Sequence, residues 1–134
     1  MGTTTKIILC VDDDKDDLLM LREAISKSAT KYHIVEAFDG QHALELLRQM
    51  QQENELPCLI ILDINMPRMD GKQTVVALQS DSRLATIPVV LFSTSSSLMD
   101  QRFSQARNVN LFIKPFSHQS LLEIAAQILS HCKV

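Results

Sequence analysis

The side chains best suited to chemistry follow short apolar runs of the sequence. Three consecutive carboxylates, Asp12, Asp13 and Asp14, come after the first run, and Asp63 comes after the third. Adjacent carboxylates repel each other, so several at one place need a cation, and an all-oxygen ligand set selects a hard ion such as Mg²⁺. A carboxylate can also attack phosphorus and form an aspartyl-phosphate. The acids therefore indicate a magnesium site at which a phosphoryl group is transferred.

Two more polar side chains occupy the same kind of position. Ser93 follows the fourth apolar run, and Lys114 follows the short fifth one. A lysine ammonium would help Mg²⁺ to neutralise a transferring phosphoryl group, and a hydroxyl can hydrogen-bond a phosphoryl oxygen. Asp39-Gly40, after the second run, indicates a turn and a helix cap instead.

The apolar runs have the length of β-strands. Three of them are continuously apolar, as in strands that are buried on both faces of a parallel sheet. The second and fifth runs suit strands nearer the edges. The expected strands lie at 6–11, 32–38, 58–62, 89–92 and 111–113.

Segments with the spacing of amphipathic helices separate these runs. Ser117 suits the cap of the last helix and Asp14 that of the first, while weaker helices are expected at 72–80 and 97–107. Strands that alternate with helices predict right-handed crossovers and an α/β sheet covered on both faces. Ligands bind beyond the carboxyl ends of the strands in such sheets, so the polar side chains should converge on one edge.

Length and composition are those of one ordinary globular domain. The 134 residues are 46% apolar and 22% charged, and the net charge is -3, unlike the basic balance of a nucleic-acid binder. Five of the 16 acids fall within residues 12–17. No apolar stretch has the length of a signal peptide or a membrane span, so we expect a cytoplasmic protein with neither nucleic acid nor membrane as a partner. Cys10, Cys58 and Cys132 are far apart and odd in number, which favours reduced, buried or half-buried thiols.

Taken in order, four motifs resemble the receiver domain of two-component response regulators. The resemblance runs from about residue 6 to about residue 131 and implies a flavodoxin-like (βα)5 doubly wound sheet with strand order 2-1-3-4-5. Because Val134 follows the last helix almost directly, we expect a single receiver domain over 1–134 without an effector domain. The motifs are Val11-Asp12-Asp13-Asp14, Leu62-Asp63-Ile64-Asn65-Met66-Pro67 running to Asp70-Gly71, Pro88-Val89-Val90-Leu91-Phe92-Ser93, and Lys114-Pro115-Phe116.

The resemblance implies a metal and a phosphoacceptor. Asp63 would accept a phosphoryl group from a histidine kinase or a phosphotransfer protein. Mg²⁺ would be held by Asp13, Asp63 and the backbone carbonyl of Asn65, with Asp12 acting through a metal-bound water. Asn65 and Ser95 would tune the access of water to the phosphoryl group.

Other positions of the motifs would serve the phosphoryl group or the backbone. Ser93 would turn toward the phosphoryl group and Lys114 would pair with its oxygens. The Lys114-Pro115 peptide is often cis in the family, which would aim the lysine. Gly71 would allow a tight turn after the Met66-Pro67 loop.

The expected output is a contact with a protein partner, self-association or onward phosphotransfer. Phosphorylation would shift a two-state equilibrium at the surface of the fourth helix, fifth strand and fifth helix. Two departures from the family concern this surface. Leu111 stands where an aromatic switch residue is usual, and Phe112 should point to the opposite face of the strand. Arg107-Asn108-Val109-Asn110 stands where the family has Gly-Ala, and asparagine suits a left-handed backbone.

Other interpretations of the acids stay open. A receiver-like module could bind its partner without phosphorylation. Alternatively, Asp12-x-Asp14 resembles the nucleophile motif of haloacid-dehalogenase-type phosphatases, with Asp12 as nucleophile and Asp14 as acid/base. If the chain is a receiver, we expect no enzymatic activity beyond self-phosphorylation and autodephosphorylation at Asp63. Asp16 and Asp17 suit the N-terminus of a helix, where the dipole stabilises acids.

Overall fold

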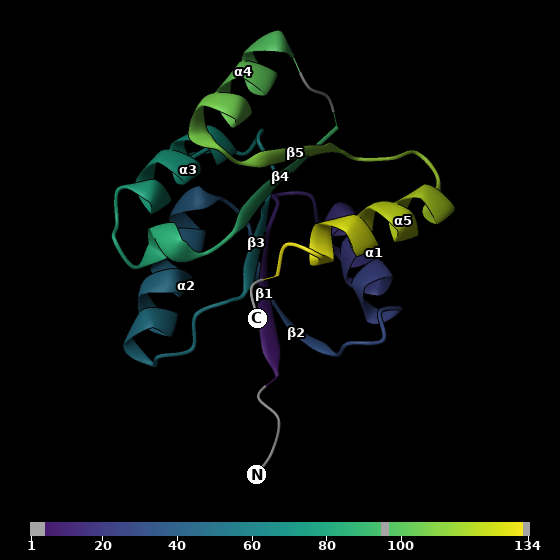
Figure 1. Cartoon of the computed structure of the whole chain (residues 1–134), viewed down its shortest axis with the longest axis horizontal. Coiled ribbons are helices and arrows are strands. Elements are labelled where there is room, and N and C mark those ends of the chain that lie inside the picture. Colours follow the sequence, from purple (N-terminus) through teal and green to yellow (C-terminus); the bar gives the residue numbers. More distant parts are fainter. Residues whose placement is uncertain (1–4, 95–96, 133–134) are drawn as a thin grey trace.

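A computed structural model describes residues 5–94 and 97–132, in which strands and helices alternate along the chain (Figure 1). None of the described helices is both long and apolar enough to cross a membrane. The elements are β1 (Lys6–Val11), α1 (Lys15–Ser26), β2 (Tyr32–Ala37), α2 (Gly40–Gln52), β3 (Leu59–Leu62), α3 (Gly71–Gln79), the short 3₁₀ helix η1 (Leu84–Thr86), β4 (Val89–Ser93), α4 (Leu98–Arg107), β5 (Asn110–Ile113) and α5 (His118–Leu129).

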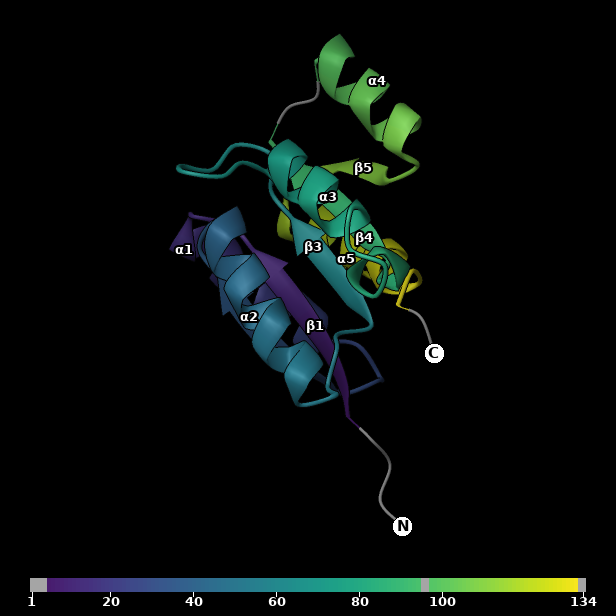
Figure 2. The same cartoon turned by 90° about the vertical axis from the view of Figure 1, so that its left-hand side faces the viewer.

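The strands form one parallel sheet in the order β2-β1-β3-β4-β5. The predicted topology is confirmed, and β2 and β5 lie at the edges as their sequence patterns indicated. Figures 1 and 2 show α1 and α5 on one side of the sheet and α2 and α3 on the other. Because all of the strands are parallel, their carboxyl ends lie at the same edge of the sheet.

Alternate side chains of the central strands enter two apolar cores. Leu9 and Val11 of β1 pack with α2 and α3, whereas Ile8 and Cys10 pack with α1 and α5. Burial on both faces explains why this strand is continuously apolar. In β5, Leu111 and Phe112 pack on opposite sides in the same way, so the phenylalanine does not replace the usual switch residue.

Local backbone features agree with most of the predicted boundaries, to within one or two residues. Asp14, Asp39 and Ser117 cap α1, α2 and α5 through their side chains. Asn108 ends α4 in the left-handed conformation, with φ of 58°, as its residue type predicted. The helix η1 has no counterpart among the predicted elements.

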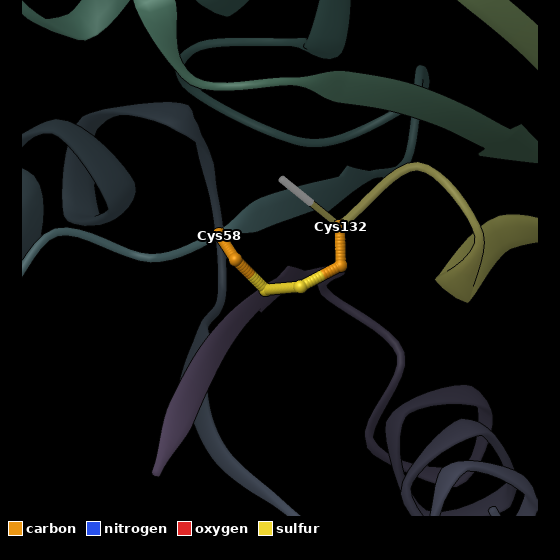
Figure 3. Close-up of a disulfide and its surroundings, with 2 residues drawn as sticks. All are labelled: Cys58 and Cys132. Atoms are coloured by element: carbon orange, nitrogen blue, oxygen red, sulfur yellow. A yellow bond between two sulfur atoms is a disulfide. The ribbon is translucent and has the colours of Figure 1, made fainter. Parts of the chain in front are cut away.

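Cys58 and Cys132 form a disulfide, so the prediction of reduced thiols is wrong for these two residues. Figure 3 shows that the bond joins the start of β3 to the chain after α5. The two Cα atoms are 4.9 Å apart although 74 positions separate them in the sequence. Sequence spacing did not indicate this contact because it depends on where α5 ends against the sheet. Cys10 is a buried free thiol, and burial raises its pKa to about 12.

Candidate functional site

The predicted site residues meet at the carboxyl edge of the sheet. Asp12 directly follows β1, Asp63 follows β3, and Lys114 follows β5. Backbone pairing continues beyond the strands: the Asp63 N–H donates to the Val11 carbonyl at 2.9 Å, and the Lys114 N–H donates to the Ser93 carbonyl at 2.7 Å. These bonds place the three charged side chains in one small region.

Three carboxylates form the acidic part of the site. One oxygen from each of Asp12, Asp13 and Asp63 lies within 4.8 Å of the other two. Asp12 and Asp63 are buried, whereas Asp13 is exposed. An all-carboxylate set with one open side fits a hard divalent cation that keeps several waters, so these residues fit Mg²⁺.

Lys114 supplies the positive charge of the site. Its Nζ donates to Asp12 Oδ2 at 2.6 Å and to Asp17 Oδ2 at 2.8 Å, and it lies 3.8 Å from Asp63 Oδ2. The lysine side chain is only 11% exposed. Asp17 lies in the first turn of α1, as predicted, but its carboxylate also contacts this buried ammonium, which was not predicted. No sequence signal separated Asp17 from Asp16, which lies in the same first turn of α1.

Burial and neighbouring charges have opposing effects on the pKa values of Asp63 and Lys114. Burial raises the pKa of Asp63 to about 7, with the Lys114 ammonium opposing the rise and the neighbouring Asp12 carboxylate adding to it. Burial lowers the pKa of Lys114, but hydrogen bonds to Asp12 and Asp17 outweigh it and leave that pKa above its usual value. Burial is thus the main obstacle to a charged Asp63, and a bound cation would stabilise that charge.

The loop from β3 to α3 is held close to Asp63 by Gly71. A Cβ at this position would lie 2.3 Å from the Asp63 carbonyl oxygen and 2.8 Å from the Ile64 Cα. The glycine is therefore required for close approach of two backbone segments, while Arg68 has the left-handed backbone of this loop, with φ of 63°. Asn65 is exposed in the same loop, two residues beyond Asp63, and its role as a ligand stays a prediction.

Ser93 ends β4 with a fully buried hydroxyl. Its Oγ has no hydrogen-bond partner in the described part of the chain. A buried hydroxyl without a partner costs free energy, so this group is ready to bond a polar atom that enters the site. The expected cis Lys114-Pro115 peptide is wrong for this structure, in which the bond is trans. Ser95 lies outside the described residues.

Asp14 serves α1 and not the acidic cluster. Its Oδ1 accepts hydrogen bonds from the backbone N–H groups of Asp16 and Asp17. The capping role predicted for it is confirmed. The carboxylate that a phosphatase would use as acid/base is thus engaged by the helix.

Comparison with known families agrees with this geometry. The family model described as the response regulator receiver domain matches residues 8–126. The chain belongs to this family. Response regulator Rcp1 of Synechocystis sp. is 33% identical over 110 residues, which cover 81% of this chain and 75% of that protein. The probable methanogenesis regulatory protein FilR2 of Methanothrix harundinacea is 32% identical over 124 residues, covering 91% and 80%.

Solved structures of receiver proteins have the same fold. The crystal structure of the phosphorylated cyanobacterial phytochrome response regulator RcpA matches with a TM-score of 0.86 at 33% identity, covering 96% of this chain and 94% of RcpA. The Mn²⁺-bound form of response regulator Rcp1 matches with a TM-score of 0.79 at 30% identity, covering 93% and 92%. This chain is thus a receiver domain of two-component signalling. The match favours interpreting Asp12-Asp13-Asp14 as the acidic motif of a receiver and not as that of a phosphatase.

Proposed function

We propose that Asp63 accepts a phosphoryl group from a histidine kinase or a phosphotransfer protein. The observation that carries this proposal is the position of the Asp63 carboxylate, beside two other carboxylates and 3.8 Å from a buried lysine ammonium. In the transfer, an Asp63 oxygen bonds to phosphorus while the bond from phosphorus to the donor's histidine nitrogen breaks. The electron pair of the broken bond stays with the imidazole.

Mg²⁺ is the cofactor that this donor set fits best. Asp13 and Asp63 would bind it directly together with the Asn65 carbonyl, and Asp12 would act through a water. The similar protein Rcp1 has an Mn²⁺-bound form, which supports a divalent cation as the ligand of this chain. When bound, such a cation would neutralise charge on the phosphoryl oxygens.

The chain's own groups would complete the binding of the phosphoryl group. The Lys114 ammonium would pair with its oxygens, because no other cation of the described residues is so close to Asp63. The Ser93 hydroxyl, which is buried and has no partner among the described residues, would donate to another oxygen. Both interactions would be strong because the groups are largely shielded from water.

Phosphorylation with acetyl phosphate and Mg²⁺, followed by intact mass, tests the proposal. We expect the wild type to gain the mass of one phosphoryl group and Asp63→Asn to gain none. A wild type that stays unmodified under conditions that phosphorylate another receiver would contradict the proposal. Partner binding that is unchanged in Asp63→Asn would instead favour a module that works without phosphorylation.

Phosphorylation would act on a protein-binding surface formed by α4, β5 and α5. Large apolar side chains are exposed on α4, at the end of β5 and in the loop before α5: Leu98, Met99, Ile113 and Phe116. An exposed apolar group of this kind is typical of a surface that binds a protein partner or a second copy of the chain. With Leu111 in place of an aromatic residue, the shift would proceed without an aromatic rotamer change.

Sedimentation of the phosphorylated protein tests self-association through this surface. We expect Met99→Glu to abolish any phosphorylation-dependent dimer, because it places a charge among exposed apolar groups. Met20→Glu is the matched control, since Met20 is an exposed methionine on α1. A dimer that persists in Met99→Glu would exclude this surface.

The cytoplasmic location and the absence of nucleic-acid and membrane partners stay predictions.

A further inference from the structure

Asp17 holds the ammonium of Lys114 in the protein without a phosphoryl group. The 2.8 Å distance from Lys114 Nζ to Asp17 Oδ2 is a hydrogen bond, whereas the 3.8 Å distance to Asp63 Oδ2 is too long for one. A lysine ammonium has three N–H donors, and Asp12 and Asp17 engage two of them. The lysine is therefore bonded to Asp12 and Asp17 and only near Asp63.

We propose that Asp17 is a positioning residue that competes with the incoming phosphoryl group for Lys114. This inference rests on the proposed phosphorylation of Asp63. Its third N–H is not bonded to Asp63, and an ammonium drawn closer to a phosphoryl oxygen there would weaken its bond to Asp17. Asp17 thereby sets how readily the lysine becomes available for the transfer.

The bond to Asp17 is the one that yields more easily. Asp12 belongs to the same buried carboxylate group as Asp63, so an ammonium that turns toward Asp63 stays close to Asp12. Asp17 comes instead from the first turn of α1 and its side chain is 33% exposed. Water can therefore solvate its carboxylate once the lysine leaves, whereas a buried carboxylate would lose its partner outright.

The charge of Asp17 also opposes transfer directly. Its carboxylate partly neutralises the ammonium that would otherwise attract the phosphoryl dianion, and it adds negative charge close to that ammonium. Removing the carboxylate should thus both free Lys114 and reduce repulsion. Stabilisation of acids by the helix N-terminus does not explain why Asp17 contacts Lys114, because Asp16 lies in the same turn and is exposed.

The test compares initial rates of phosphorylation by acetyl phosphate at fixed Mg²⁺. We expect Asp17→Asn to react about threefold faster than wild type or more, and Asp17→Ala to react at least as fast as Asp17→Asn. Asp16→Asn is the matched control, with the same change of charge and the same helix turn, and should stay within about twofold of wild type. Asp17 variants that are slower than wild type, or no faster than Asp16→Asn, would overturn the inference.

A second measurement needs neither metal nor phosphorylation. Urea unfolding in EDTA of Asp17→Asn, Lys114→Met and the double variant forms a double-mutant cycle. We expect the double variant to lose less stability than the two single losses together, because both single changes break the same ion pair. Additive losses would overturn the inference. A wild type that takes no phosphoryl group would refute the proposed function itself. Non-additive losses in the cycle would then still show that Asp17 contacts Lys114 in the unphosphorylated protein.

Discussion

The carboxyl group of Asp63 is buried among like charges, and this makes its protonation a property of the whole site. Its pKa of about 7 lies well above the usual value near 4, mainly because of burial. Between about pH 4 and pH 7, Asp63 is therefore protonated in the folded protein, whereas the unfolded chain has already released this proton. The contribution of Asp63 to stability is full below about pH 4 and is lost as the pH rises through about 7.

This sign leads to a prediction for the metal-free protein. Asp63→Asn should unfold at a higher temperature than wild type at about pH 8, because the amide is uncharged where the wild-type side chain is a buried, charged carboxylate. The difference should shrink toward about pH 5, where the wild-type carboxyl is protonated. Thermal unfolding in EDTA measures it. A difference that does not change with pH would contradict the raised pKa.

Single residues could be predicted where their position at a strand end defined them. Asp12, Asp63 and Lys114 follow apolar strands, and parallel strands bring such positions together. Asp17 could not be recognised, because an acid in the first turn of a helix has the same sequence signature whether or not a lysine reaches it. Its partner Lys114 lies 97 positions away.

At the scale of the elements, the start of α3 determines where the loop after β3 runs. The Gly71 N–H donates to the Ile64 carbonyl at 2.8 Å, and the Gly71 Cα faces the backbone of Asp63. The motif predicted a glycine-dependent turn, but the physical need is space for a neighbouring backbone. Sequence alone does not distinguish these two reasons for a glycine.

Gly71→Ala should therefore displace the loop that carries the predicted metal ligands. We expect a loss of stability of about 2–3 kcal/mol, because the new methyl group meets backbone atoms and not a flexible side chain. Mg²⁺ affinity, measured by calorimetry on the folded variant, should fall as well. Val76→Ala, on the exposed side of the same helix, is the control and should leave Mg²⁺ affinity unchanged. Unchanged affinity in Gly71→Ala would mean that the loop does not position the metal.

For the molecule as a whole, the sheet could be predicted because its pattern is regular. Apolar runs that alternate with amphipathic segments define strands, crossovers and the edge where side chains meet. The pairing of Cys58 with Cys132 has no such regularity. It depends on the length of α5 and on the turn after it, which bring Cys132 beside Cys58 at the start of β3 (Figure 3).

The disulfide should make a large contribution to the stability of the whole domain. A bond that closes a loop of 74 residues restricts the unfolded chain, which in the chain-entropy estimate is worth roughly 4 kcal/mol. We expect a reducing agent to lower the free energy of unfolding of the wild type by an amount of this order, measured by urea denaturation. The disulfide lies at the start of β3, whereas Asp63 lies after the opposite end of this strand. Phosphorylation of the reduced, folded protein should therefore persist.

Serine variants separate loss of the bond from other effects of the reducing agent. The double variant Cys58→Ser with Cys132→Ser should be about as stable as the reduced wild type and should not respond to the reducing agent. Cys10→Ala, which removes the buried free thiol, should keep the full response because it leaves the bond in place. If the wild type is equally stable with and without reducing agent, while intact mass shows that the bond was oxidised and then reduced, the bond does not stabilise the fold. That result would mean that noncovalent contacts, such as the packing of α5 against α1 and the sheet, are enough to hold this helix to the core.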